Sequence, residues 1–259
     1  MTYMLSGTMD RGVMDYQLEG AIGKIVGSEN AWWVCDEAIQ ILGGMGFMRE
    51  AQLERVLRDL RVFRIFEGTN EILRLFVVLT GMQFAGGHLR ELAKALKNPV
   101  ANLGVVLGEA GKRGARTLGV GSGPSLSEHV HSNLQGSAKL TSQSVEKFGT
   151  AVESLLRKHG KNIIEEQFLL NRLANSAIDI FSMVCVLSRA TRSLNQSAPT
   201  AGQETLITDI FCRQASNRIA RHLGELKSSQ QLKDYEGMAE LAREAYKTQG
   251  VFTTHPLGL

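Results

Sequence analysis

The residue of this sequence whose surroundings most suggest chemistry is Glu67. It follows a segment of apolar residues and arginines at 61–66 and precedes a glycine, after which a second apolar helix pattern begins. A carboxylate beside an aromatic side chain at a break between two helices can be partly desolvated, which makes it a better proton acceptor and a candidate general base. The alternative is structural: Thr69 or Asn70 caps the next helix, and Glu67 and Glu71 favour its positive end. Caps are the commoner of the two roles, so the surrounding sequence has to decide between them.

A glycine-rich stretch, QILGGMGF at 40–47, is the second candidate for contact with a ligand. By itself this pattern favours a glycine C-cap followed by a tight turn. The other interpretation is a backbone that a ligand can approach closely, because glycines leave no side chain in the way. The stretch is not a phosphate-binding fingerprint, since no strand precedes it.

The elements that would position these residues are helices. Apolar residues recur every three or four positions along most of the chain, which is the period of an amphipathic helix with one buried stripe. The expected helices span 15–42, 50–62, about 69–87, and four more segments within 136–250. The sequence therefore predicts an all-α protein whose last part is a helical bundle.

Composition bounds the function further. Of the 259 residues 43% are hydrophobic and 21% charged, as in ordinary soluble proteins, and the net charge of +3 is too small to argue for nucleic acid binding. The 3 cysteines lie far apart among apolar residues, which predicts core positions for Cys35, Cys185 and Cys212 rather than a disulfide framework. No histidine spacing matches a metal motif, so no metal site is expected. No run reaches the roughly 18–20 apolar residues of a membrane-spanning helix.

The segment 96–133 differs in character from its neighbours. Its first part combines apolar residues with lysines and arginines, and it ends in a stretch rich in glycine and serine before Pro124. One interpretation is an amphipathic helix that lies on a membrane surface and attracts anionic headgroups. The other is a linker between domains, and the residues alone leave both open.

Three segments in a fixed order resemble the C-terminal helical domain of the acyl-CoA dehydrogenases: QILGGMGF, LERVLRDLRVFRIF and FEGTNEILR. The resemblance extends over essentially the whole chain and is greatest to members that act on very long acyl chains, with a complex I assembly factor as a second relative. It implies an incomplete dehydrogenase C-terminal bundle over 1–95, a basic segment with a possible membrane contact over 96–133, and an added helical domain over 134–259.

The resemblance also implies roles for single residues. Glu67 would be the catalytic base that removes the α-proton of an acyl-CoA thioester, with Phe66 and Gly68 at the substrate. The β-hydrogen would pass to FAD, giving a trans-2-enoyl-CoA. The positions that would contact FAD are Thr69, Asn70 and Glu71 for one subunit and, for the ADP half of the flavin of the neighbouring subunit, Gln40, Ile41, Leu42, Gly43 and Gly44. A homodimer with flavin sites shared across its interface is therefore expected.

The remaining expectations concern partners and location. The resemblance implies electron-transfer flavoprotein as the electron acceptor and a position at the matrix face of the inner mitochondrial membrane, which the basic segment would contact. The family also has a first helical domain and a β-domain, which this chain lacks, so the chain alone is expected to be inactive. The alternatives are a non-enzymatic assembly or scaffold protein of the complex I assembly type, and a peripheral membrane module of helices.

Overall fold

The computed structural model describes residues 1–97, 125–254 and 257, and the side chains of all of these except 88–97. The helices of the described residues are α1 (Thr2–Asp10), α2 (Gln17–Leu42), α3 (Gly44–Phe47), α4 (Leu53–Val62), α5 (Asn70–Lys97), α7 (Gln135–His159), α8 (Gln167–Asn195), α9 (Ala201–Glu225) and α10 (Ser229–Thr248). Short 3₁₀ turns lie at Arg49–Ala51, Ser127–His129, Ser132–Leu134 and Gly160–Glu165. Within this part of the chain there is no β-strand, which confirms the all-α prediction.

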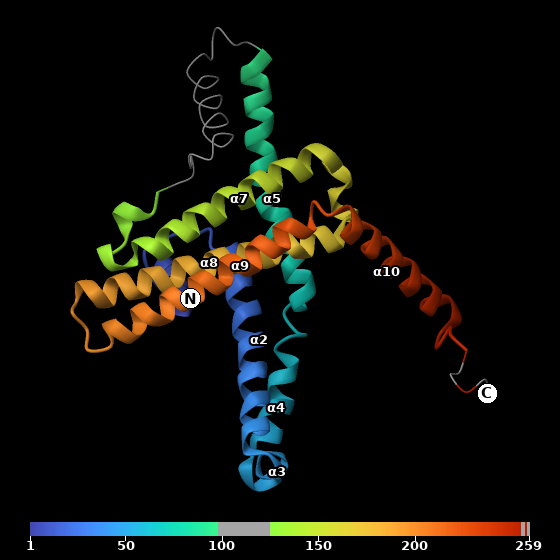
Figure 1. Cartoon of the computed structure of the whole chain (residues 1–259), viewed down its shortest axis with the longest axis horizontal. Coiled ribbons are helices and arrows are strands. Elements are labelled where there is room, and N and C mark those ends of the chain that lie inside the picture. The colour runs from blue at the N-terminus through green and yellow to red at the C-terminus, as the bar shows by residue number, and fades with distance from the viewer. Residues whose placement is uncertain (98–124, 255–256, 258–259) are drawn as a thin grey trace.

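The helices α2 and α4 lie side by side and project from the rest of the molecule as an arm, residues 17–62, with α3 at its tip (Figure 1). The predicted helix over 15–42 is present with nearly the expected bounds. The predicted helix over 50–62 begins later, at Leu53, because Gln52 adopts a left-handed conformation that ends the preceding turn. The guanidinium of Arg61 lies 5.8 Å from the centroid of the Trp32 ring and so links the two helices of the arm.

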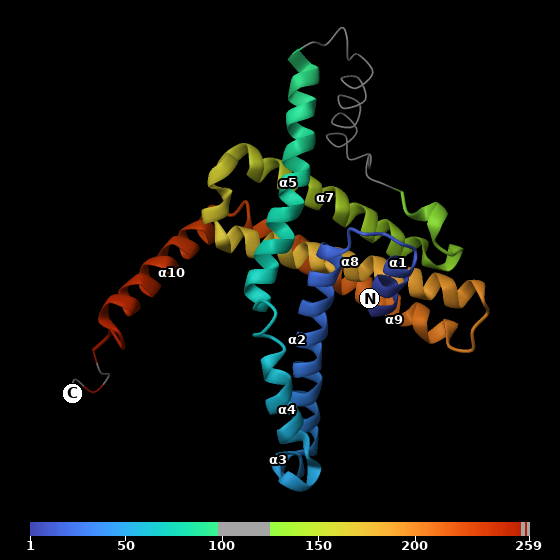
Figure 2. The same ribbon diagram turned by 180° about the vertical axis from the view of Figure 1, so that it is seen from behind.

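The helices α7, α8 and α9 lie alongside one another and cross the line of the arm, as both ribbon views show (Figures 1 and 2). The helix α8 is central, since it packs against α5, α7 and α9. By length and hydropathy alone α8 is the one described helix that qualifies as a membrane span, although the sequence indicated none. In this fold it is a core helix, with Leu169, Leu170 and Leu173 almost fully buried.

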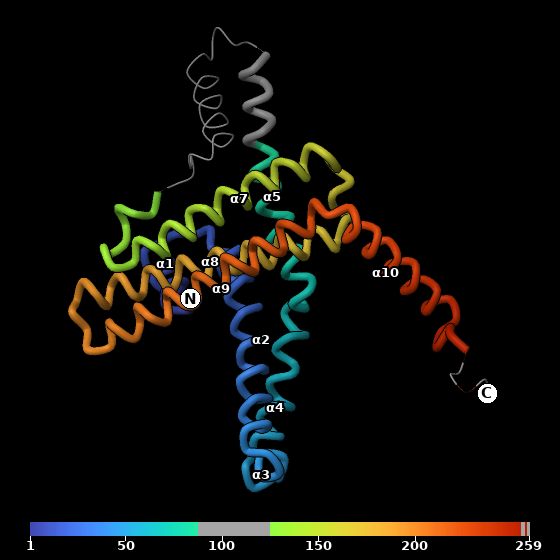
Figure 3. Tube along the Cα trace, viewed as in Figure 1, coloured from blue at the N-terminus to red at the C-terminus, as the bar shows by residue number. Residues whose placement is uncertain are grey.

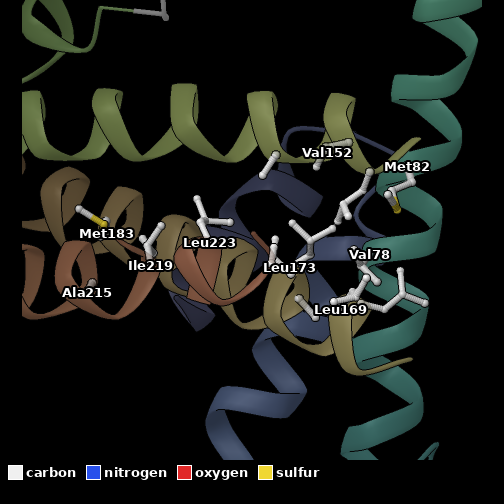
Figure 4. Packing of buried hydrophobic residues seen from close by; sticks show 14 of the residues in the cluster. Val78, Met82, Val152, Leu169, Leu173, Met183, Ala215, Ile219 and Leu223 are labelled. Carbon is white, nitrogen blue, oxygen red and sulfur yellow. The ribbon is translucent and has the colours of Figure 1, made fainter. Parts of the chain in front are cut away.

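The largest apolar core joins the two halves of the chain. Val78 and Met82 of α5 pack in the same buried cluster as Leu169 and Leu173 of α8 and Leu223 of α9 (Figure 4). A smaller cluster joins α2 to α5 and α8 through Ile22, Ile25, Val77 and Ile178. The arm and the last helices are therefore fixed to each other by buried apolar contacts.

Other expectations have mixed outcomes. The three cysteines are buried, as predicted. The basic segment lies mostly outside the described residues, and the division of the chain at 95 and 134 stays a prediction. The helix α10 extends away from α7–α9 toward the C-terminus (Figure 3), and Tyr235 is its one buried residue.

Candidate active site

Glu67 lies on the turn between α4 and α5, and its backbone conformation is unusual. Its φ of 56° is in the left-handed region, and Gly68 follows with φ 87°. The turn is closed by the N–H of Phe66, which donates to the carbonyl of Val62 at 3.0 Å, and by the N–H of Asn70, which donates to the carbonyl of Arg64 at 3.2 Å. A left-handed conformation is common for glycine but costs other residues about 1–2 kcal/mol, and such strain concentrates at functional sites.

The carboxylate of Glu67 is exposed, which differs from the partly desolvated position that the sequence suggested. Its aromatic neighbours do not cover it: Phe66 packs edge-to-face against Phe63, with ring centroids 5.3 Å apart. Phe63 and Phe66 are themselves each 43% exposed, and Ile65 is 50% exposed. Glu67 thus stands in an open apolar surface, and only another body covering this surface can exclude water from it.

Helix α2 holds the turn through Lys24, Ser28 and Glu29. The ammonium Nζ of Lys24 donates to the carbonyl of Gly68 and to Oδ1 of Asn70, both at 2.8 Å. The amide Nδ2 of Asn70 donates to Oγ of Ser28 at 3.0 Å and to Oε1 of Glu29 at 3.1 Å. Asn70 is fully buried with its polar atoms paired, so it acts as an anchor between the turn and α2.

A second layer of contacts supports this anchor. Arg74 of α5 donates to both carboxylate oxygens of Glu29, at 2.7 and 2.8 Å, and its Nε donates to Oδ1 of Asn175 on α8 at 2.8 Å. Burial alone would raise the pKa of Glu29, but the hydrogen bonds and charge of Arg74 outweigh it and leave the pKa lowered. Burial lowers the pKa of Lys24, against the opposing charges of Glu71, Glu29 and Glu67.

Three of the predicted flavin contacts lie at the start of α5. Oγ1 of Thr69 accepts the N–H of Ile72 at 3.3 Å, so the capping role proposed from sequence is present at Thr69. Asn70 fits a cofactor role least well of the three, because its amide and its N–H are already paired within the chain. Glu71 is exposed on the first turn of the helix.

The predicted segment Gln40–Gly44 joins α2 to α3 at the tip of the arm, whereas the turn that carries Glu67 joins the opposite end of α4 to α5 (Figure 2). A Cβ added at Gly43 or Gly44 would meet nothing within 4 Å, and Ile41 is 82% exposed, so the backbone here is open to a ligand. Gly46 is different, since a Cβ there would collide with the backbone of Ile39. A single chain therefore does not bring its two predicted flavin segments together.

Sequence analysis missed the contacts of α2 with the turn. Lys24 and Glu29 flank the buried positions Ile25 and Ser28 of α2. Charged residues next to a buried stripe often pair with polar groups of a neighbouring element, and this was the signal available in the sequence. Among the described residues no group of histidine, cysteine or acidic side chains is placed to hold a metal ion.

Two family models match this chain. The model described as "Acyl-CoA dehydrogenase, C-terminal domain" matches residues 1–80, and the model described as "ACAD9/ACADV, C-terminal domain" matches residues 132–251. Together they include the turn with Glu67, the arm and the helices α7–α10.

Curated relatives match the whole chain. It is 53% identical over 259 residues to the mitochondrial very long-chain specific acyl-CoA dehydrogenase of Bos taurus and 52% identical over 259 residues to that of Homo sapiens. The match covers 100% of this chain but only 40% of each relative, so the chain spans well under half of their length. A probable acyl-CoA dehydrogenase of Bacillus subtilis is 31% identical over 220 residues, which are 83% of this chain and 33% of that protein.

A solved structure has a similar fold. It is an acyl-CoA dehydrogenase of Bacillus anthracis, complexed with FAD, which superposes with a TM-score of 0.63 at 25% sequence identity. The similarity covers 86% of this chain and 36% of the other.

Proposed function

This chain belongs to the acyl-CoA dehydrogenase family, and we propose that it is the C-terminal part of a flavin-dependent enzyme that converts long-chain acyl-CoA to trans-2-enoyl-CoA. The observation that carries this proposal is Glu67: a residue in a left-handed conformation, in an exposed apolar surface, on a turn that side chains of α2 hold in place. A helix cap alone would not need that conformation, and Thr69 already caps α5.

In the proposed reaction the Glu67 carboxylate accepts the α-proton of the thioester. That proton is weakly acidic, so the base needs a dry site, which the exposed surface around Phe63, Ile65 and Phe66 provides once substrate and the rest of the protein cover it. The N–H of Glu67 is not used in the bonds that close the turn, so it is the proposed donor to the thioester carbonyl, where it stabilises the charge that develops as the proton leaves. Phe66 and Gly68 would line the acyl-CoA site, as in the family.

FAD, when bound, supplies the acceptor for the β-hydride. The open backbone at Gly43 and Gly44 suits contact with a large cofactor, and so does the start of α5 at Thr69 and Glu71. Because these segments lie at opposite ends of the arm, they would serve two different flavins, which supports the proposal of a homodimer with sites shared between subunits. The FAD in the Bacillus anthracis enzyme supports the same cofactor here.

The names of the mammalian relatives support a mitochondrial location and a preference for very long acyl chains. We propose in addition that the whole protein lies at the matrix face of the inner membrane and passes electrons to electron-transfer flavoprotein. Both rest on the family alone. An assembly role without catalysis is the second candidate, because the model that matches residues 132–251 is named for two kinds of family member.

The test is the replacement Glu67→Gln in the flavin-loaded full-length protein. Palmitoyl-CoA should bleach the flavin absorbance of the unaltered protein. The Gln variant should still bind palmitoyl-CoA, but its rate of bleaching should be lower by about 10³-fold or more, because the proton acceptor is gone. Glu236→Gln, at an exposed site on α10, is the matched control and should bleach normally. Equal bleaching by the Glu67 variant contradicts the assignment of the base, and no bleaching by any form favours the assembly role.

A further inference from the structure

Lys24 of α2 contacts the turn that carries Glu67 through two hydrogen bonds. Its ammonium donates to the carbonyl of Gly68, the residue directly after Glu67, and to Oδ1 of Asn70, both at 2.8 Å. Holding a lysine side chain in one conformation costs rotamer entropy, which these bonds must offset. A lysine that is only partly exposed and has two such acceptors is therefore a fixed part of the site.

The carbonyl that Lys24 holds belongs to the turn itself. Gly68 has φ 87°, and its peptide connects the strained Glu67 to Thr69, the cap of α5. Without a donor at this point, that carbonyl would turn toward water, and Glu67 would be free to leave its left-handed conformation. The bond to Asn70 fixes the other end of the same turn, since Asn70 is also held by Ser28 and Glu29.

The ammonium of Lys24 also interacts with nearby charges. Three carboxylates act on it: Glu71 from α5, Glu29 from α2 and Glu67 from the turn. Glu29 is already paired with Arg74 and is also influenced by Arg64. The other two carboxylates belong to the residues directly before Gly68 and directly after Asn70, the two residues that Lys24 holds.

We propose that Lys24 is a positioning residue for dehydrogenation, which holds the Gly68 and Asn70 ends of the turn so that Glu67 keeps its conformation. The inference rests on the proposed function. It goes beyond the family assignment of a base, because it assigns a specific residue on another helix to the control of that base.

The experiment compares three replacements in the flavin-loaded full-length protein. Lys24→Met removes both the bonds and the charge, Lys24→Gln keeps a donor without charge, and Lys24→Arg keeps both. Lys139→Met, at an exposed site on α7, is the matched control. For each variant the turnover per bound flavin and the KM for palmitoyl-CoA are measured, together with flavin content.

We expect Lys24→Met to lower turnover per flavin by about 10-fold or more with little change in KM, because the base is displaced but the substrate surface remains. Lys24→Gln should show a smaller loss of turnover than Lys24→Met, because it keeps a hydrogen-bond donor, and Lys24→Arg should recover most of the turnover. Should Lys24→Met not fold, the comparison of Gln with Arg makes the same distinction.

Two outcomes overturn the inference. One is a Lys24→Met variant whose turnover per flavin matches that of Lys139→Met. The other is a loss of flavin content alone, with normal turnover in the molecules that retain flavin, which would make Lys24 merely structural. The proposed function fails separately: it is wrong if Glu67→Gln turns over normally, whatever Lys24 does.

Discussion

The turn between α4 and α5 has two consecutive left-handed residues, and only the second is a glycine. A glycine at 67 would remove about 1–2 kcal/mol of strain, so keeping a carboxylate there has a cost to stability. The hydrogen bonds from Lys24 and Asn70 offset that cost locally. Strain of this kind fits a residue that is kept for chemistry.

At the same scale, Gly46 and Gly44 should behave very differently when each is replaced by alanine. In Gly46→Ala the new Cβ would lie 2.8 Å from Cα of Ile39 and collide with the carbonyl oxygen of the same residue, which is backbone and cannot move aside. We expect a loss of about 2–3 kcal/mol of unfolding free energy, from this overpacking. Thermal unfolding measures it.

Gly44→Ala is the matched control, because a Cβ there meets nothing within 4 Å and the residue lies in a helix. The midpoint of its thermal unfolding should change little. Equal midpoints for the two variants would mean that the turn at the tip of the arm is packed more loosely than described.

At the scale of elements, α2 acts as a platform that binds the turn, and α5 transmits that fixation to α8. Arg74 of α5 donates hydrogen bonds both to Glu29 of α2 and to Asn175 of α8. Helix α8 therefore supports α5, the helix that begins at the candidate site. The candidate turn is therefore held directly by α2 and, through Arg74 of α5, is also connected to α8.

The pair of Arg74 and Glu29 should contribute to stability in a pH-dependent way. The side chains are only 15% and 30% exposed, so Arg74→Met should cost about 1–3 kcal/mol by leaving the Glu29 carboxylate without its main partner. The folded pKa of Glu29 is below its ordinary value of 4.5. The contribution of this ion pair to stability is therefore complete above about pH 4.5, and it is lost as the pH falls through the lower pKa that Glu29 has in the folded state.

Urea unfolding at pH 7 and at progressively lower pH checks this. The difference in unfolding free energy between the unaltered chain and Arg74→Met should shrink as the pH falls below 4.5. The double replacement Glu29→Gln with Arg74→Met should be less destabilised than the sum of the single ones. A difference that is constant with pH would contradict an ionised pair.

At the scale of the whole molecule, the shared core of α5 with α7–α9 predicts that the described helices unfold together. Leu173 is fully buried in that core, so Leu173→Ala should cost about 2–5 kcal/mol. The 2 tryptophans, Trp32 and Trp33, both lie on the arm, whereas circular dichroism reports all helices. In the 259-residue chain, thermal unfolding followed by tryptophan fluorescence and by circular dichroism should give one common midpoint. Leu173→Ala should lower that midpoint equally in both signals. Two separate midpoints would instead support independent domains on either side of the segment 96–133.

The sequence by itself determined the all-α class, the approximate extents of α2 and of the last four helices, and the break that isolates Glu67, because apolar periodicity and glycine punctuation are local signals. It also pointed to the family through three segments in order. Only the tertiary structure decided that Asn70 is buried and bonded to α2, that Glu67 is exposed, and that Lys24 holds its turn. Lys24 and Gly68 are 44 residues apart along the chain, and such pairings depend on how helices pack, which no local pattern records.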